Sequence, residues 1–104
     1  MSDKLLNPTH QLIEQHLGAL TKNEELPEDM QQLTEWLYHR VKYMLAHEQE
    51  QLAQAMYRID VAEPLFHEAL SGIPSADVAA NLTKLILDRE QKKAYWREKY
   101  KNGI

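Results

Sequence analysis

Five histidines are the residues of this sequence most suited to metal or acid–base chemistry. They are His10, His16, His39, His47 and His67. A carboxylate-bridged metal site in a helical bundle needs a Glu three residues before an inward-facing His on two of its helices. No histidine here has a Glu at that spacing, and the His-Glu-x-x-His pattern of zinc peptidases is missing as well. The sequence therefore predicts no metal ion and no other cofactor.

Nucleophilic and phosphate-transfer chemistry also lack the residues that they need. The chain has no Cys, and its three serines are Ser2, Ser71 and Ser75, of which the last two stand at expected helix boundaries. The three glycines lie far apart, at positions 18, 72 and 103, so no glycine-rich loop could bind a phosphate. We therefore expect no catalytic residue and no enzyme activity.

Four charged residues in two segments could form a polar site. They are Arg58, Asp60, Glu63 and Arg89. Arg89 follows Leu85 and Ile86 at helical spacing, which predicts that its stem continues an apolar row and that its guanidinium needs a carboxylate or helix-terminal carbonyls as partner. We interpret the four as a structural clamp that holds the turn before residue 61 against the last helix. A small-ligand site near Arg58 and Arg89 is the alternative.

Aromatic and basic residues near the C-terminus follow the spacing of one helix face. Steps of three or four residues give Leu82, Ile86, Arg89, Lys93, Trp96 and Tyr100. A second set outside the expected core has the same spacing and comprises Trp36, Arg40 and Tyr43. Trp, Tyr and Arg are enriched where protein interfaces bind most tightly. The predicted partner contacts are therefore Trp96, Tyr100, Arg97, Trp36, Arg40 and Tyr43.

The C-terminal row could instead be covered in one of two different ways. The first helix of the same chain could pack over it, or single-stranded nucleic acid could stack on Trp96 and Tyr100 between neighbouring cations. The charge of the whole chain, −4, argues against nucleic acid and against an anionic membrane. The charge is nevertheless uneven, because residues 84–104 carry seven Lys or Arg and three Asp or Glu, whereas residues 1–83 carry five and thirteen.

The elements that must position these residues are helices. The sequence has no alternating β-branched run, and apolar residues recur at helical spacing almost throughout. Caps, prolines and glycines divide the chain into predicted helices at about 8–22, 28–46, 48–57, 61–70 and 76–101. Asn7-Pro8 is expected to begin the first helix, and a polar run at residues 47–51 to separate the second from the third. Asp60 with Glu63 is expected to cap the fourth helix, Gly72 to end it, and Ser75 to cap the fifth. With 104 residues, 43% of them hydrophobic, we predict one all-α domain, residues 1–104, a bundle of four to five helices with a long C-terminal helix.

Two segments resemble a group of small bacterial all-helical proteins of unassigned function. The first is Tyr57-Arg58-Ile59-Asp60-Val61-Ala62-Glu63, and the second is Leu85-Ile86-Leu87-Asp88-Arg89-Glu90-Gln91-Lys92-Lys93. The similarity covers roughly residues 33–93. It implies a short helix joined to the next through a Tyr-Arg-Ile-Asp-Val-x-Glu segment, followed by a long final helix. The resemblance implies no activity, and it extends neither to the first helix nor to the tail after Lys93.

These observations predict a small protein of unknown function that acts as a non-catalytic interaction or self-assembling module. Its partner would be another protein or a second copy of itself, as in a homodimer. Nucleic-acid binding through the C-terminal helix and small-ligand binding near Arg58 and Arg89 are the alternatives. Because the chain has no Cys and no apolar signal or membrane-spanning segment, we expect a cytoplasmic protein without a membrane partner.

Overall fold

The computed structural model describes residues 3–23 and 25–101, which form five helices. They are α1 (Asp3–Leu17), α2 (Met30–His47), α3 (Gln49–Ile59), α4 (Glu63–Leu70) and α5 (Val78–Lys101). No strand occurs within the described ranges. The predicted all-α fold with a long C-terminal helix is therefore confirmed.

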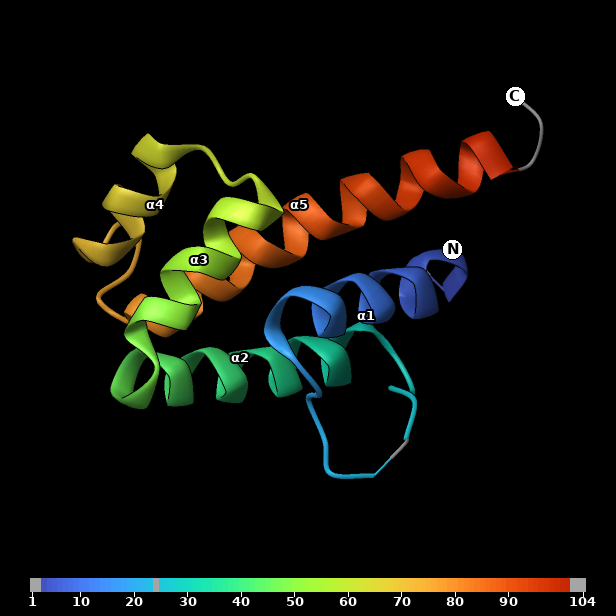
Figure 1. Cartoon of the computed structure of the whole chain (residues 1–104), viewed down its shortest axis with the longest axis horizontal. Helices are drawn as coiled ribbons and strands as arrows, with labels where there is room; N and C mark the ends of the chain where they lie inside the picture. Colours follow the sequence, from blue (N-terminus) through green and yellow to red (C-terminus); the bar gives the residue numbers. More distant parts are fainter. Residues whose placement is uncertain (1–2, 24, 102–104) are drawn as a thin grey trace.

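Helix α5 is the element on which the others are assembled. It packs against α1, α2, α3 and α4. Figure 1 shows that α1 and α2 run in the opposite direction to α5, so that the described start of α1 and the end of α5 lie at the same end of the molecule. The short helices α3 and α4 cover α5 near its beginning. The C-terminal half of α5 consequently has fewer helices around it than the N-terminal half.

The core lies where α1, α2, α3 and α5 meet. The row on α2 that the sequence predicts to be apolar is buried at Leu33, Leu37, Val41 and Met44. It packs in one cluster with side chains of the other helices, among them Ile13, Met56, Ile59, Leu82 and Ile86. Full burial of such side chains stabilises the fold by about 1.5–3 kcal/mol each, so this cluster is the main reason that the helices associate.

The first helix begins and ends about five residues earlier than predicted. Its observed bounds are Asp3–Leu17 rather than about 8–22. The Asn7-Pro8 pair was expected to mark its start, but Leu6 packs into the core and extends the helix toward the N-terminus, with Pro8 inside it. Gly18, with a φ of +85°, ends the helix because the left-handed backbone conformation suits glycine.

The break between the second and third helices lies where the sequence predicts it. Glu48 separates α2 from α3 with a non-helical backbone. At the start of α2, however, Asp29 is the N-cap rather than a first-turn residue, and its Oδ1 accepts a hydrogen bond of 2.8 Å from the Gln32 amide. A carboxylate at this position still faces the positive end of the helix dipole.

The expected capping box of the fourth helix is wrong. Asp60 is the left-handed C-cap of α3, with φ 67° and ψ 45°, and α4 begins only at Glu63 with no side-chain cap. A proline is best tolerated in the first turn of a helix, where its missing N–H is not needed. The start at Glu63 places Pro64 at the second helical position, whereas a start at residue 61 would have placed it at the fourth.

The cap of the last helix is Asp77 rather than the predicted Ser75. Asp77 Oδ1 accepts a hydrogen bond of 3.1 Å from the Ala80 amide, and α5 begins at Val78. Ser75 supports the cap from outside, since its Oγ accepts a hydrogen bond of 2.9 Å from the Asp77 amide. Asp and Ser are both strong N-caps, so the residue types at positions 75 and 77 did not decide which of the two caps α5.

Candidate functional site

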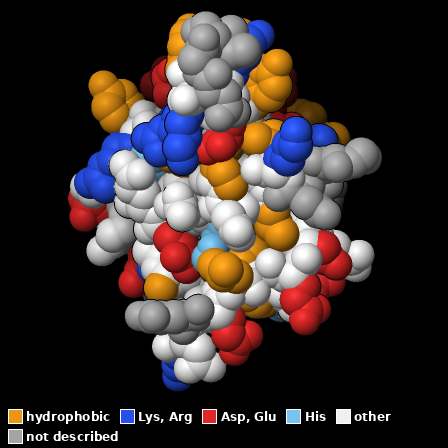
Figure 2. Space-filling view, turned by 90° about the vertical axis from the view of Figure 1, so that its right-hand side faces the viewer, with side chains coloured by type: hydrophobic (Ala, Val, Ile, Leu, Met, Phe, Trp, Pro, Cys, Tyr) orange, Lys and Arg blue, Asp and Glu red, His pale blue; other side chains and the backbone are white. Residues whose placement is uncertain are grey.

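The C-terminal half of α5 carries a surface that we call the basic–aromatic face. It is lined by Arg89, Lys93, Trp96, Arg97, Tyr100 and Lys101. Trp96 is 50% exposed and Tyr100 is 70% exposed. Figure 2 looks at this end of the molecule, where most Lys and Arg side chains lie in the upper half of the view with hydrophobic side chains among them. The face therefore combines large apolar rings with positive charge.

The lengths of the helices explain why this face is uncovered. At about 1.5 Å per residue, α5 is about 36 Å long, whereas α3 and α4 are about 16 and 12 Å long. The helices α3 and α4 cover α5 only as far as the contact between Asp60, at the end of α3, and Arg89. Beyond Arg89, α1 packs along α5 on the side of Glu90 and Ala94, both fully buried, and leaves Trp96 and Tyr100 exposed.

The buried row of α5 and the row that carries the predicted contacts separate after Ile86. The buried row continues in steps of four through Glu90 and Ala94. A second row, on a neighbouring side of the helix, follows in steps of three and four and reaches the surface: Arg89, Lys93, Trp96 and Tyr100. Packing of α1 on α5 is observed, but it does not bury the two aromatic rings.

The aromatic rings of this region lie close together beside a cation. The ring centroids of Trp96 and Tyr100 are 6.2 Å apart, and those of Tyr95 and Trp96 are 5.4 Å apart. Lys99 Nζ lies 5.2 Å from the centroid of the Trp96 ring. Aromatic pairs at these separations attract each other, and a cation over a ring adds to the attraction. The rings are thus held in one group before any partner binds.

Two of the three residues in the second predicted contact set, Trp36 and Arg40, lie against the first helix of the same chain. Arg40 Nε donates a hydrogen bond of 2.9 Å to the carbonyl oxygen of Leu17, and Arg40 Nη2 lies 3.5 Å from Glu48 Oε1. The Trp36 ring is half-buried, with its centroid 6.2 Å from that of His10. Tyr43 is exposed under the Arg40 guanidinium. Arg40 and Trp36 are therefore already engaged in holding α1 to α2.

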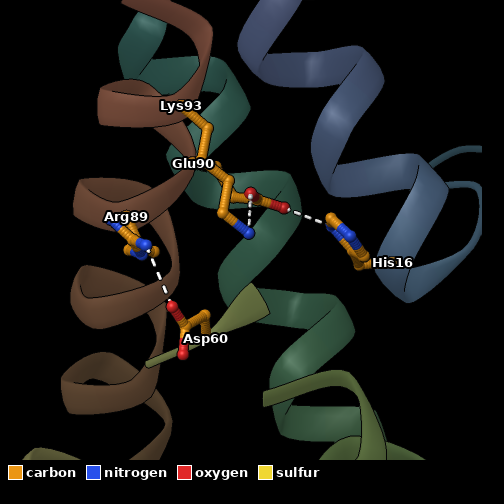
Figure 3. Close-up of polar contacts among 5 residues, drawn as sticks. All are labelled: His16, Asp60, Arg89, Glu90 and Lys93. Carbon is orange, nitrogen blue, oxygen red and sulfur yellow. Dashed lines mark hydrogen bonds and ion pairs between the residues drawn. The ribbon is translucent and has the colours of Figure 1, made fainter. Parts of the chain in front are cut away.

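The structure brings two of the four predicted clamp residues together. Arg89 Nη2 lies 3.1 Å from Asp60 Oδ2, which ties the turn after α3 to α5 (Figure 3). Arg58 and Glu63 are exposed and form no ion pair with another described side chain. The two arginines thus do not act on one described group together, and the geometry gives less support to a ligand site shared by them.

A groove between α3 and α4 adjoins this contact, and we call it the α3–α4 groove. It has a volume of about 320 Å³ and is lined by Met56, Tyr57, Asp60, Val61, Glu63 and Phe66, together with two alanines. Tyr57, 86% exposed, stands at its rim. Two carboxylates and no Lys or Arg line it, so the groove combines an apolar floor with negative charge.

Sequence reasoning did not single out a polar contact between α1 and α5, which joins His16 to the buried side chain of Glu90. His16 Nδ1 and Glu90 Oε2 are 2.6 Å apart, and Lys93 Nζ lies 3.8 Å from Glu90 Oε1 (Figure 3). Glu90 is fully buried. A signal was present, because His16 follows Leu12 and Ile13 at helical spacing and Glu90 lies four residues after Ile86. The pair links α1 to α5 behind the basic–aromatic face.

A second unpredicted polar contact joins the start of α5 to α2. Tyr38 donates a hydrogen bond of 2.9 Å to Asp77 Oδ2. Hydrogen bonds from the Ala80 amide and from Tyr38 hold the pKa of Asp77 below its usual value. The same bond to Asp77 raises the pKa of the Tyr38 hydroxyl. The contact fixes the first turn of α5 against α2.

Comparisons with known proteins give no match to this chain: no family model, no curated protein and no solved structure is similar to it. Within residues 3–23 and 25–101, no group of three or more His, Asp or Glu side chains could hold a metal ion. None of the described helices is long and apolar enough to cross a membrane. Any function must therefore be argued from the surfaces of the molecule itself.

Proposed function

We propose that the protein is a non-catalytic interaction module that binds another protein through the basic–aromatic face. The observation that carries the proposal is the exposure of Trp96 and Tyr100 among four cations, on a helix that extends beyond its own short neighbours. Large exposed apolar groups rimmed by polar residues mark interaction sites in soluble proteins. Trp, Tyr and Arg are also the side chains that contribute most to interface affinity.

The charge of the face specifies the kind of partner. Its four cations are Arg89, Lys93, Arg97 and Lys101. Arg89 and Lys93 each have a carboxylate of the same chain nearby, whereas Arg97 and Lys101 form no ion pair with another described side chain. Complementary charge steers association and excludes partners of like charge. The partner we propose therefore offers carboxylates beside an apolar surface.

Single-stranded nucleic acid is the second candidate, because Trp96 and Tyr100 lie between cations where bases could stack. The two candidates differ in their response to salt. Phosphate contacts release bound counterions, so affinity for nucleic acid falls steeply as salt rises. Apolar contacts of aromatic rings with a protein do not weaken in this way.

The test uses the fluorescence of Trp96. The chain has two tryptophans, so Trp36→Phe leaves Trp96 as the only one. We expect its emission to shift to shorter wavelength when an amphipathic helical peptide of Glu and Leu is added, because the ring becomes buried. A matched peptide of Lys and Leu is the control and should give no shift. A further control, Trp36→Phe with Arg97→Glu, should bind the acidic peptide about tenfold more weakly.

Two results would overturn the proposal. One is an unchanged emission with the acidic peptide at near-millimolar concentration. The other is tighter binding of a single-stranded oligonucleotide, with an affinity that falls steeply between low and physiological salt, which would favour the nucleic-acid candidate instead.

A further inference from the structure

We propose that the acidic partner is a second copy of this chain, and that the basic–aromatic face of each copy docks into the α3–α4 groove of the other in a two-fold dimer. This inference rests on the proposed function, because it names the partner of the same face. The chemistry of the two surfaces, their position on the molecule and the reach of α5 support it.

The α3–α4 groove has the chemistry that the basic–aromatic face needs. Met56 and Phe66 are among its apolar lining residues, Glu63 supplies a carboxylate that forms no ion pair with another described side chain, and Asp60 supplies one that is already paired with Arg89. Met56 belongs to the core, so the partly exposed ring of Phe66 is the apolar surface that an incoming ring would contact. The groove is large enough for one aromatic side chain at about 320 Å³. A partner that places an aromatic ring on the apolar lining and a cation beside a carboxylate would match both the apolar surface and the negative charge of the groove.

The charges around the two surfaces are opposite. Residues 49–70, from the start of α3 to the end of α4, carry four Asp or Glu and one Arg, a net charge of −3. Residues 84–104 carry a net charge of +4. A dimer that paired two basic–aromatic faces directly would bring cations against cations, which is unfavourable. A dimer that pairs each basic–aromatic face with a groove brings opposite charges together at both contacts.

The two surfaces adjoin each other on one side of the molecule. Asp60 lines the groove, Arg89 lines the basic–aromatic face, and these two side chains are in contact. One continuous surface therefore has an acidic apolar half and a basic aromatic half. A two-fold rotation places each half of such a surface on the opposite half of its copy, so one interface satisfies both contacts at once.

A single copy cannot fill its own groove with its own aromatic residues. Trp96 and Tyr100 follow Arg89 by seven and eleven residues in one unbroken helix, which places them about 10 and 16 Å further along its axis. Arg89 lies at the edge of the groove through Asp60. Because α5 points away from the groove, only the α5 of another copy can bring these rings to it (Figure 1).

The experiment is a charge exchange followed by sedimentation velocity on the full chain. Native protein should sediment as a dimer at tens of micromolar. Arg97→Glu alone and Glu63→Lys alone should each raise the dimer dissociation constant about tenfold or more, because each places like charges at both contacts. An equimolar mixture of the two variants should restore the native constant, since every contact in the mixed dimer then joins opposite charges. Lys84→Glu, an exposed change on α5 outside the face, is the control and should dimerise as the native chain does.

Three results would overturn the inference. They are a native monomer at tens of micromolar, a dimer unaffected by both single changes, and variants that fail to associate on mixing. Far-UV circular dichroism of each variant checks that the helices are intact, which is expected because both changed side chains are exposed. If the native chain is monomeric while Trp96 still responds to the acidic peptide, the dimer is wrong and the proposed function stands. If neither the dimer nor the fluorescence response is observed, the dimer and the proposed function are both wrong.

Discussion

At the residue scale, the pair formed by His16 and Glu90 has the largest expected effect on stability. Glu90 is fully buried, and its Oε2 is bonded only to His16 Nδ1 among the described groups. His16→Ala would leave a buried carboxyl group without that partner, so we expect a loss of about 3 kcal/mol in the free energy of unfolding. Urea denaturation measures it.

A double change separates the pair from its apolar surroundings. His16→Leu combined with Glu90→Leu removes both polar groups, so it should be less destabilising than His16→Ala alone. His47→Ala, at an exposed position, is the matched control and should have little effect. A loss below about 0.5 kcal/mol for His16→Ala would show that the pair does not hold α1 to α5.

The carboxyl group of Asp77 should make stability depend on pH in the acid range. Its pKa is lowered in the fold by the Ala80 amide and by Tyr38. The folded protein therefore binds this proton less readily than the unfolded chain does. The stabilisation is present above the unfolded pKa and is lost as the pH falls from about 4 through the lower, folded value.

The measurement is the urea midpoint at pH 6 and pH 3 for native protein and Asp77→Asn. We expect the native midpoint to fall more than that of the variant, since the variant lacks the titrating group. Tyr38→Phe should give an intermediate loss, because the Ala80 hydrogen bond remains. Equal losses in all three proteins would contradict the assigned role of Asp77.

At the scale of the elements, the turn between α3 and α4 depends on the backbone conformation of Asp60. In the left-handed region, Gly is free of the steric conflict that most side chains meet, whereas an N-cap position accepts Ser at least as well as Gly. Asp60→Gly should therefore be less destabilising than Asp60→Ser, by about 1 kcal/mol. Both substitutions remove the contact with Arg89. The difference between the unfolding temperatures of the two variants therefore reports the backbone preference at position 60 alone. The reverse order would support the N-cap role that the sequence suggested.

At the scale of the whole molecule, association should appear as stability that depends on concentration. A ligand or copy that binds only the folded chain stabilises it by mass action. We expect the urea midpoint of the native protein to rise between one and one hundred micromolar, roughly the range over which the proposed dimer forms. Trp96→Ala with Tyr100→Ala should abolish that rise.

The same double variant also separates folding from association. Both side chains are at least half exposed, so at low concentration its free energy of unfolding should lie within about 0.5 kcal/mol of the native value. A large loss under those conditions would mean that the rings support the fold itself rather than a partner.

Local patterns in the sequence were enough to locate the helices and most of their junctions. Apolar residues at helical spacing identified the buried row of α2, the polar run around Glu48 located the break before α3, and Gly72 marked the end of α4. These features depend on neighbours three or four positions away in the chain. They can therefore be read without knowing which helices pack together.

The side of α5 that is buried beyond Ile86 was set by tertiary packing instead. From the sequence, the row through Trp96 and Tyr100 was predicted to contact a partner or to be covered by the first helix, and the row through Glu90 and Ala94 was not singled out. The packing of α1, with His16 bonded to Glu90, buried the latter row and left the aromatic rings exposed. Burial on a helix depends on where other helices lie, and their positions follow from contacts between residues far apart in the chain. The residues of the candidate interface could therefore be named from the sequence, but only the tertiary structure decided that α1 leaves the rings of Trp96 and Tyr100 exposed.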